Sequence, residues 1–364
     1  MQHSSLTPSE RMAKLVSRLT DFDVDVLLLL DMKNIRYLTG FTGSDGGLVV
    51  GKGRKVLMVD GRYINQAKRE AGDVEIFEYR DKMDAIEEVL SYGGSVTVGF
   101  ESAAMSVDTF CKLKEKLKGV ELRGLSDGIS TIRAIKDEGE IECIKKAAYI
   151  SFQALAAVKD LIKPGVREKD IALELEFQMG KHGAEGASFP TIVASGVNSA
   201  LPHAAPGARR LEEGDIVLMD FGAVYSGYRS DETLTFAVGR ADEDQRRAYA
   251  LVKDAHDRAL EAVGAGVACK EIDRVARSCI ENGNMGTYFT HGTGHGVGLD
   301  VHETPRIGIK SESILEAGMV VTIEPGVYIP DLWGIRVEDT VLVKESGYEI
   351  LTNVSKEFMI LNQS

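Results

Sequence analysis

The chain of 364 residues lacks the features that mark secreted and membrane proteins. Its four cysteines form no Cys-x-x-Cys pair and no dense framework, which argues against a disulfide scaffold or a zinc–thiolate site and favours a reducing cytoplasm. The stretch Met1–Pro8 is polar and lacks the charged-then-apolar pattern of a signal peptide. The most hydrophobic run, Val24–Leu30, is far shorter than the ~20 residues that a membrane-spanning helix needs. We therefore expect a cytoplasmic protein without a membrane partner.

Positive charge is also scarce. The chain has 43 Lys and Arg against 56 Asp and Glu, which gives a formal net charge of -13. Because phosphate binding needs concentrated Lys and Arg, we expect no nucleic-acid partner. What is present is typical of a globular protein, with 44% hydrophobic and 27% charged residues. The length exceeds what one hydrophobic core usually organises, so two domains are expected.

The first 130 residues alternate short apolar runs with amphipathic stretches, a pattern typical of a small α/β domain. Strands are expected at Val24–Leu30, Gly47–Val50, Lys55–Val59 and Val96–Phe100, and helices at residues 8–21, Tyr63–Ala71, Lys82–Ser91 and Val107–Leu117. A long helical pattern then covers Asp137–Leu161. We place the two domains at residues 1–130 and 131–364.

The second domain contains a faint internal repeat. Pro164–Ile171 aligns without gaps on Ala265–Ile272, at an offset of 101 residues. In both copies a helical pattern precedes the segment, another follows it, and Gly-rich strands come next. The repeat favours a domain built from two similar α/β halves with the site between them, and chance similarity at a common helix junction is the alternative.

Two pairs of acids stand out in the last third of the chain, and the first pair is Asp220 and Asp231. They flank a stretch whose centre, at Tyr225 and Ser226, is typical of a turn between two apolar runs. A hairpin folded there places the two carboxylates roughly opposite each other. Because cross-strand neighbours lie within roughly 5 Å of each other, the two acids can share a metal ion.

The second pair, Glu324 and Glu338, repeats this arrangement. The two glutamates are symmetric about Asp331, which lies in a turn-forming stretch with apolar runs on both sides. A second hairpin therefore brings a second pair of carboxylates together. Two hairpins that each pair their acids are hard to explain as surface decoration.

A Gly-rich run from His291 to Glu303 contains three of the seven histidines within twelve residues: His291, His295 and His302. No Lys-Ser/Thr follows the glycines, which argues against a phosphate-binding loop. Glycines also let the backbone pass close to a buried centre while the histidines point into it. A hydrogen-bonded core role is the alternative for any one of these histidines.

The chemistry of this set limits the metal and the reaction. Four carboxylates and the His295 imidazole, without a thiolate, favour Mn²⁺, Co²⁺, Zn²⁺ or Fe²⁺ over a thiophilic metal. Two ions ~3.5–4 Å apart can bind a bridging water and lower its pKa toward neutrality. The resulting hydroxide can attack a carbonyl, and the metals then stabilise the oxyanion. The residues therefore predict a two-metal hydrolase.

Five ordered motifs resemble the pita-bread metallopeptidases, and most closely their proline-specific branch, Xaa-Pro aminopeptidase (aminopeptidase P) and Xaa-Pro dipeptidase (prolidase). The motifs are Met219–Gly222, Ser230–Thr233, His291–Glu303, Ile323–Tyr328 and Gly334–Asp339. Asn34–Gly46 and Asp60–Tyr63 resemble the creatinase-type N-terminal domain of short bacterial aminopeptidases P. The resemblance implies an α/β (α+β) fold, with a small creatinase-like domain before a pita-bread domain of two pseudo-symmetric α/β halves. It also implies a homodimer.

Carried over position by position, the resemblance assigns a role to each acid. Asp220 would chelate one divalent metal ion and His295 the other, while Asp231 and Glu338 would bridge the two. Glu324 would bind the second metal and shuttle the proton from the attacking water to the leaving imino nitrogen. Manganese is the favoured metal, with cobalt, zinc or iron as alternatives.

Further residues match outer positions of the family. His203 matches a histidine near the scissile bond, and His302 one that hydrogen-bonds the substrate carbonyl or its oxyanion. His291 matches a histidine that the methionine-specific branch generally lacks, which points toward proline specificity. Tyr328 and Arg336 match supporting positions, with Arg336 pairing with a bridging acid and fixing its orientation. A purely structural role is the alternative for these last two.

The main expectation is an Xaa-Pro aminopeptidase, acting on peptides with proline at the second position. Such bonds lack the N–H and are conformationally restricted, so a dedicated site makes chemical sense. The first alternative is a prolidase that acts only on dipeptides, with Arg306 meeting the free carboxylate, although Arg306 could equally be a solvated loop charge. The remote alternative is a non-catalytic peptide- or protein-binding module, which would show substitutions at the five ligand positions, and this sequence shows none.

Overall fold

The computed structural model describes residues 5–91, 96–126, 129–352 and 354–362, and it divides into two units that meet between Arg133 and Ala134. Residues 1–4, on which the expected absence of a signal peptide rests in part, lie outside the described residues. Within the described part of the chain, no helix has both the length and the apolar content to cross a membrane. Each unit has its own sheets and its own hydrophobic core.

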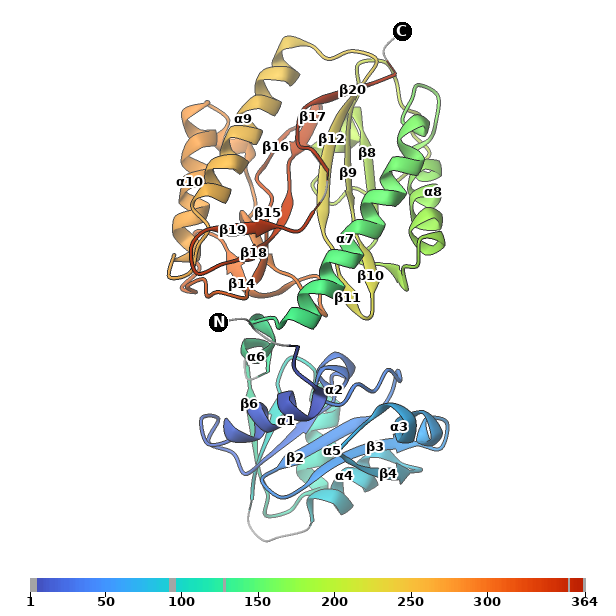
Figure 1. The fold of residues 1–364 in the computed structure, drawn as a ribbon, viewed down its shortest axis with the longest axis vertical. Helices are drawn as coiled ribbons and strands as arrows, with labels where there is room; N and C mark the ends of the chain where they lie inside the picture. Colours follow the sequence, from blue (N-terminus) through green and yellow to red (C-terminus); the bar gives the residue numbers. More distant parts are fainter. Residues whose placement is uncertain (1–4, 92–95, 127–128, 353, 363–364) are drawn as a thin grey trace. The chain divides into compact units, whose positions relative to one another are not determined.

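The N-terminal unit contains a mixed six-stranded sheet in the order β4-β3-β2-β1-β5-β6 (Figure 1). Its strands are β1 (Val26–Leu29), β2 (Gly47–Gly51), β3 (Lys55–Asp60), β4 (Glu75–Tyr79), β5 (Thr97–Glu101) and β6 (Glu121–Leu125). Its helices are α1 (Pro8–Ser17), α2 (Met32–Thr39), α3 (Ile64–Glu70), α4 (Lys82–Leu90) and α5 (Val107–Lys116), and α6 (Ser130–Ala134) spans the boundary. The α/β prediction is confirmed.

The sequence prediction missed β4, β6 and α2 in this unit. Exposed charged residues interrupt the apolar pattern of both strands, since β4 begins at Glu75 and β6 at Glu121. The short helix α2 is fixed by its ends, because the side chain of Asp31 accepts a hydrogen bond from the Lys33 amide. Gly40 ends the helix in the left-handed conformation, with φ of 79°. The Asp31 cap and the left-handed Gly40 therefore indicate α2 more clearly than the apolar pattern of its eight residues does.

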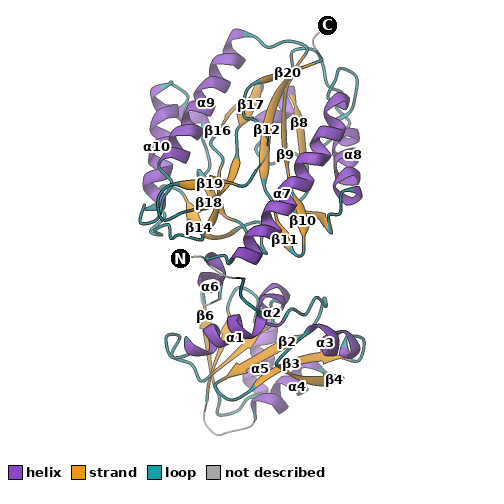
Figure 2. Ribbon diagram, in the orientation of Figure 1, coloured by secondary structure: helices purple, strands orange, loops and turns teal. Residues whose placement is uncertain are grey.

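In the C-terminal unit, strands lie between two pairs of helices, α7 with α8 and α9 with α10 (Figure 2). The helices are α7 (Glu138–Val158), α8 (Glu168–Lys181), α9 (Glu243–Glu261) and α10 (Cys269–Asn282), with the short 3-10 turns η1 (Lys159–Leu161), η2 (Gly196–Ala200) and η3 (Gly286–Tyr288). The strands are β7 (Gly186–Ala187), β8 (Ile192–Ser195), β9 (Ile216–Phe221), β10 (Ala223–Tyr225), β11 (Tyr228–Arg229), β12 (Glu232–Val238), β13 (Gly294–Gly296), β14 (Glu303–Ile307), β15 (Val320–Ile323), β16 (Gly326–Ile329), β17 (Trp333–Arg336), β18 (Asp339–Val343), β19 (Tyr348–Ile350) and β20 (Met359–Leu361).

The predicted repeat corresponds to matching backbone contacts in the two halves of this unit. The amide of Gly165 donates to the Leu211 carbonyl over 2.8 Å, and the amide of Gly266 donates to the Leu315 carbonyl over the same distance. Each leucine returns a hydrogen bond to the valine after its glycine. Both glycines are left-handed, with φ of 88° and 84°. The two pseudo-symmetric halves are therefore confirmed, and α8 and α10 are equivalent helices.

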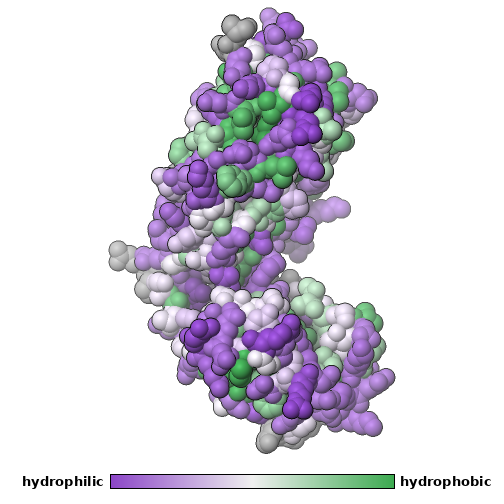
Figure 3. Space-filling model, turned by 90° about the vertical axis from the view of Figure 1, so that its right-hand side faces the viewer, coloured by the Kyte–Doolittle hydropathy of each residue, from purple (hydrophilic) through white to green (hydrophobic). Residues whose placement is uncertain are grey.

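Figure 3 looks onto the side of the molecule where α8 lies in Figure 1, and hydrophobic side chains gather there among polar ones. On α8 itself, Leu173 and Phe177 are exposed and lie one helical turn apart. The opposite side of the helix is buried, with Ile171 and Leu175 in the core shared with α7. The helix is therefore apolar on more than one side.

Candidate metal centre

The first acid pair lies on the hairpin formed by β9, β10, β11 and β12. Its turn is Ser226-Gly227, one step later than predicted, with φ of 49° and 80° as a type I′ turn requires. This shift changes the pairing, because Asp220 lies opposite Thr233 rather than opposite Asp231. The two acids are diagonal neighbours on one face of the hairpin, which still places them within reach of a common ion.

The second acid pair lies on a longer hairpin folded about Asp331, as the spacing predicts. Near the turn, Gly326 pairs with Arg336, and beyond the acids Ile323 of β15 pairs with Asp339 of β18. Both ladders keep one register, so Glu324 and Glu338 face each other across the gap between them. Asp331 itself is left-handed, with φ of 61°.

The Gly-rich run passes close to the backbone of the neighbouring strands, as its composition predicts. A Cβ atom on Gly294 would lie 1.9 Å from the Thr322 carbonyl oxygen, and one on Gly296 would lie 2.5 Å from the Thr304 oxygen. Only glycine fits at such approaches. The run therefore brings His295 of β13 against β15, where the His295 amide donates to Thr322 Oγ1 over 3.1 Å.

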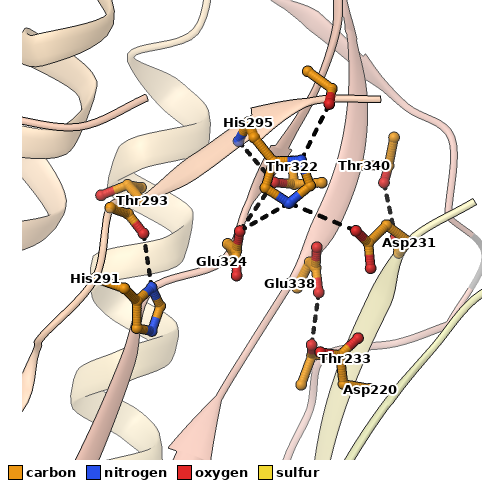
Figure 4. A network of polar contacts seen from close by, with 12 residues as sticks. Asp220, Asp231, Thr233, His291, Thr293, His295, Thr322, Glu324, Glu338 and Thr340 are labelled. Atoms are coloured by element: carbon orange, nitrogen blue, oxygen red, sulfur yellow. Dashed lines mark hydrogen bonds and ion pairs between the residues drawn. The ribbon is translucent and has the colours of Figure 1, made fainter. Parts of the chain in front are cut away.

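Three acids form a tight cluster at the centre of the two hairpins. Carboxylate oxygens of Asp220, Asp231 and Glu338 all lie within 4.8 Å of one another, and Asp231 and Glu338 are buried (Figure 4). Oδ1 of Asp220 is buried without a hydrogen-bond partner among the described residues. A buried carboxylate oxygen is costly unless it is paired or binds a metal, so this cluster fits a divalent cation.

His295 and Glu324 complete the cluster (Figure 4). Nε2 of His295 lies 3.3 Å from Oε1 of Glu324 and 3.6 Å from Oδ2 of Asp231, while its Nδ1 lies 3.1 Å from the Gly296 carbonyl oxygen. Hydrogen bonding of Nδ1 to this carbonyl directs Nε2 toward the acids, where it donates to Glu324 in the metal-free protein and would offer its lone pair to a bound metal. All five predicted ligands are thus brought to one place.

The electrostatics of the cluster show an excess of negative charge. Burial raises the pKa of Asp231 well above its ordinary value, and the charges of Glu338 and Asp220 raise it further. Burial raises the pKa of Glu338 in the same way, with Glu324 and Asp220 adding to it. Burial also raises the pKa of Asp220, against the opposing charge of Arg336. Without a cation, the cluster therefore tends to take up protons.

Glu324 behaves differently from the other acids. Burial alone would raise its pKa, but the hydrogen bond from His295 and the charge of that ring outweigh burial and lower the pKa to about 2. Conversely, burial lowers the pKa of His295, and Glu324 outweighs it, so the pKa of the imidazole is raised. Glu324 is therefore ionised at neutral pH. Thr322 Oγ1 also donates to its Oε1 over 3.3 Å.

Arg336 corrects one expectation. The resemblance pairs it with a bridging acid, but its NH2 group lies 2.6 Å from Oδ2 of Asp220, the acid assigned to one metal alone. Its NH1 donates to the Tyr328 hydroxyl over 2.6 Å, and its Nε donates to Thr233 Oγ1 over 3.0 Å. Thr233 in turn donates to Oε2 of Glu338 over 2.6 Å, so Arg336 reaches that bridging acid only through a hydroxyl.

The three outer histidines surround this cluster at different depths. Nε2 of His291 lies 2.9 Å from the Tyr328 hydroxyl, and the His302 ring packs edge-on against His295 at 4.3 Å between ring centroids. His203 is exposed on the turn that follows η2. Burial lowers the pKa of both His291 and His302, with smaller contributions from other charges that include His203. The rings of His291 and His302 are therefore neutral at pH 7.

Arg306 lies on β14, directly opposite His295 in the strand register. Its side chain is exposed. Facing residues of paired strands project to the same side, so the Arg306 side chain lies on the same face of the sheet as His295. The solvated-charge alternative stays open.

Sequence reasoning missed the residues that support the acids. Thr233 and Thr322 each donate a hydroxyl to a carboxylate of the cluster. Both lie two residues from a predicted ligand, and strand alternation could have placed them on the same face. The buried Lys356, which pairs with Glu232 and Asp339 behind the acids, could not have been found, because no local pattern connects it to them.

Comparison with known proteins gives a consistent result. The family model described as metallopeptidase family M24 matches residues 142–345, and the creatinase/prolidase N-terminal domain matches residues 11–135. An Xaa-Pro dipeptidase of Pyrococcus furiosus is 39% identical over 350 residues, which cover 96% of this chain and 99% of that protein.

Solved structures agree over nearly the whole chain. An Xaa-Pro dipeptidase from Bacillus anthracis is 36% identical with a TM-score of 0.94, covering 98% of this chain and 100% of its own. An X-Pro aminopeptidase from Thermotoga maritima is also 36% identical, with a TM-score of 0.89, covering 96% of this chain and 99% of its own.

Proposed function

The chain belongs to metallopeptidase family M24, with a creatinase/prolidase N-terminal domain, and on that premise we propose that it is a metal-dependent prolidase, which cleaves Xaa-Pro dipeptides. The observation that carries the proposal is the buried cluster of four carboxylates and one imidazole on two hairpins and a Gly-rich strand. A structural protein would neutralise these acids with its own cations. Among the described residues, the cluster forms ion pairs only with Arg336 and His295.

The donor set supports two divalent cations, with manganese as the favoured ion. Asp220 would hold one ion and His295 and Glu324 the other, with Asp231 and Glu338 between them. Oδ1 of Asp220 is the buried oxygen that lacks a protein partner among the described residues, and an ion would satisfy it. When bound, divalent cations activate a water molecule and stabilise negative charge on a carbonyl oxygen.

Glu324 is proposed to move the proton of this reaction. Its carboxylate lies beside the other acids of the cluster, where it would accept a proton from the attacking water and pass it to the proline nitrogen as the bond breaks. The Thr322 hydroxyl holds its Oε1 in place. We expect Glu324→Gln to fold normally and nearly abolish turnover. Wild-type rates in the purified, metal-loaded variant would contradict this role.

His291 and His302 are proposed to bind the substrate as neutral hydrogen-bonding groups. His302 borders the cluster through its contact with His295, and His291 is linked through the Tyr328 hydroxyl to Arg336. The exposed His203 would contact the substrate from the other half. We expect His291→Ala to lower turnover of Xaa-Pro bonds with metal content unchanged. Unchanged kinetics would return His291 to a structural role.

The dipeptide preference is supported by the relatives, since the Pyrococcus furiosus and Bacillus anthracis proteins are Xaa-Pro dipeptidases. This places the prolidase alternative ahead of the aminopeptidase that the sequence analysis favoured. Arg306, exposed opposite His295, is the candidate group for the free carboxylate of a dipeptide. The second candidate function remains an aminopeptidase P, favoured by the similarity to the Thermotoga maritima structure.

The test is release of the N-terminal residue from Ala-Pro and from Ala-Pro-Ala-Ala, with Mn²⁺ added to chelator-treated protein. Cleavage of the dipeptide alone supports a prolidase, and Arg306→Met should then raise KM for Ala-Pro, with Arg306→Lys retaining part of the affinity. Cleavage of the tetrapeptide establishes the aminopeptidase instead. Activity on neither, despite bound metal, would favour the peptide-binding alternative. The homodimer and the cytoplasmic location stay predictions.

A further inference from the structure

Two buried carboxylates outside the metal centre have no part in the chemistry above. Glu168 and Asp273 are both fully buried, at 0% exposure. Glu168 is the first residue of α8, and Asp273 lies in the second turn of α10, the equivalent helix of the other half. A buried carboxylate is costly unless its oxygens are hydrogen-bonded, so the identity of the donors shows what each acid holds in place.

Glu168 binds both ends of the loop that carries His203. Its Oε1 accepts hydrogen bonds from the Ser195 amide over 2.8 Å and the Ser195 hydroxyl over 2.7 Å. Nδ2 of Asn198 lies 3.0 and 3.1 Å from its two oxygens. At the far end of the loop, the Gly207 amide donates to Oε2 over 3.1 Å. His203 thus lies on a segment closed at both ends by one side chain.

The loop that carries His203 is also attached to the second acid hairpin. The Gly334 amide donates to Oγ of Ser199 over 2.9 Å, and NH1 of Arg336 lies 3.3 Å from the carbonyl oxygen of Pro202, the residue before His203. A displacement of this loop relative to the second acid hairpin would therefore move the turn that carries His203. Glu168 fixes the loop from the helix side, and the hairpin fixes it from the centre.

Asp273 holds the segment that carries His291 in a similar way. Its Oδ1 accepts hydrogen bonds from the Thr293 amide over 3.1 Å and the Thr293 hydroxyl over 2.9 Å. It also pairs with Arg277, which lies one turn further along α10 and donates to the carbonyl oxygens of Phe289 and His291 over 3.0 and 2.9 Å. The segment from Phe289 to Thr293 is thus held from one side by an acid and its arginine.

We propose that Glu168 and Asp273 are positioning residues, one in each half, which set the places of His203 and His291 relative to the metal centre. The inference rests on the proposed function, because the exact place of these histidines matters only if they meet a substrate. Among the described residues, every hydrogen bond of the Glu168 carboxylate comes from the loop that carries His203. Asp273 likewise binds only the segment around His291 and the arginine that shares it.

The isosteric variants Glu168→Gln and Asp273→Asn test this directly. Both oxygens of each carboxylate face donors, so an amide nitrogen must point at one of them and lose its contact. Glu140→Gln is the matched control, because Glu140 is also buried and accepts hydrogen bonds from Tyr228 and the Asp137 amide, away from the outer histidines. Variants that melt below the assay temperature are replaced by Glu168→Asp and Asp273→Glu.

The first measurement needs no activity. Carbon–hydrogen correlation spectra of the histidine rings are recorded for the metal-free protein, with the seven histidines assigned by single substitutions. We expect Glu168→Gln to move the His203 signal and leave His291, Asp273→Asn to do the reverse, and Glu140→Gln to move neither. Equal or absent shifts of both histidines in the two variants would overturn the proposal.

The second measurement is a pair of double-mutant cycles on Ala-Pro hydrolysis. We expect each anchor variant to lower kcat/KM by on the order of ten- to a hundredfold, since misplacement by about 1 Å can cost that much. The loss should vanish when Asp273→Asn is made in a His291→Ala background, and when Glu168→Gln is made in His203→Ala. The crossed pairs should remain additive.

The outcomes separate this proposal from the proposed function. Additive losses in the matched pairs would assign both acids a purely structural role. If the wild type hydrolyses no Xaa-Pro peptide yet each ring signal moves in its own variant, the positioning role stands and the peptidase proposal fails. If the wild type is a peptidase but neither the spectra nor the double-mutant cycles link Glu168 to His203 and Asp273 to His291, the proposed function stands and the positioning role fails.

Discussion

Two pairs of buried acids are adjacent in the sequence but differ in their cationic partners. Asp231 and Glu338 belong to the metal centre, and their sequence neighbours Glu232 and Asp339 are also buried but face another environment. Lys356 pairs with both of these neighbours, and Nε2 of His256 lies 3.3 Å from Oδ2 of Asp339. Cations thus contact Glu232 and Asp339 directly, whereas among the described residues Asp231 and Glu338 have only the His295 ring, 3.6 Å from Asp231, and the more distant charge of Arg336.

The pKa shifts follow this difference. Burial would raise the pKa of Asp339, but Lys356 and His256 outweigh it and the pKa is lowered. The pKa of Glu338, one residue earlier, is raised well above its ordinary value by burial and by like charges. The comparison teaches that depth of burial does not mark a functional acid. What separates Asp231 and Glu338 from Glu232 and Asp339 is the surrounding charge, because neighbouring acids raise the pKa of the first two and Lys356 pairs with the other two.

The largest expected effect comes from the acids of the metal centre. Glu338→Gln should lower Ala-Pro hydrolysis by more than about a hundredfold, since even outer partners of metal ligands cost that much. The metal-free variant should be no less stable than the wild type, because the change removes a repelled charge. The rate is measured by proline release after saturation with Mn²⁺. Near-wild-type turnover would show that Glu338 is not a metal ligand.

For Glu232 and Asp339, the pair that Lys356 neutralises, we expect a substitution to affect the free energy of unfolding. Lys356→Met leaves Glu232 and Asp339 buried without their cation, and we expect it to lower the free energy of unfolding by about 3–5 kcal/mol. Lys253→Met is the control, because Lys253 is partly exposed and bridges Asp257 near the surface, where about 1 kcal/mol or less is at stake. Urea unfolding measures both. Equal losses would show that the Lys356 network is no more important than a surface pair.

Adding Mn²⁺ should offset the repulsion among the buried acids of the metal centre and so raise the free energy of unfolding. At a free Mn²⁺ concentration of about 100 times Kd, the wild type should gain about 2.7 kcal/mol of stability per site. The gain should be far smaller in Asp231→Asn, whose fold retains Glu232 and its lysine. Thermal unfolding with and without Mn²⁺ decides this. A gain of the same size in both proteins would mean that the ion binds elsewhere.

The smallest effect is the pH dependence of the metal-free protein. Because the folded pKa of Glu338 is raised, the native state binds more protons than the unfolded state, so this group lowers stability as pH rises from about 4. The folded pKa of Asp339 is lowered, so its contribution is present above about pH 4 and is lost as pH falls further. Glu338→Gln should therefore become more stable than the wild type with rising pH, and Asp339→Asn less stable. Parallel curves would contradict both assignments.

Much of the metal centre could be predicted from the sequence because its ligands follow short local rules. The turn at Asp331 fixes the register of Glu324 and Glu338 over the whole hairpin. The first hairpin was predicted one residue off, because two adjacent positions, Ser226 and Gly227, had to take left-handed conformations. A shift of one residue changes which residues face each other but keeps Asp220 and Asp231 on one face.

Supporting residues that are distant in sequence from their partners could not be predicted from the sequence. Glu168 contacts Ser195, 27 residues away, and Lys356 contacts Glu232, 124 residues away, so these partners are set by tertiary packing alone. The partner of Arg336 was also predicted wrongly, since a motif places a residue near the centre without specifying which carboxylate it meets. Local patterns thus identify the ligands, while the network that orients them needs the structure.

The central claim is that the acid cluster around Asp231 and Glu338 binds the metals that make this chain a peptidase. Equilibrium dialysis against Mn²⁺ followed by elemental analysis tests it most directly, in the wild type and in the double variant Asp231→Asn/Glu338→Gln. We predict two ions per wild-type chain and at most one in the folded double variant, with loss of Ala-Pro hydrolysis. Two ions in both proteins, or none in the wild type, would contradict the claim.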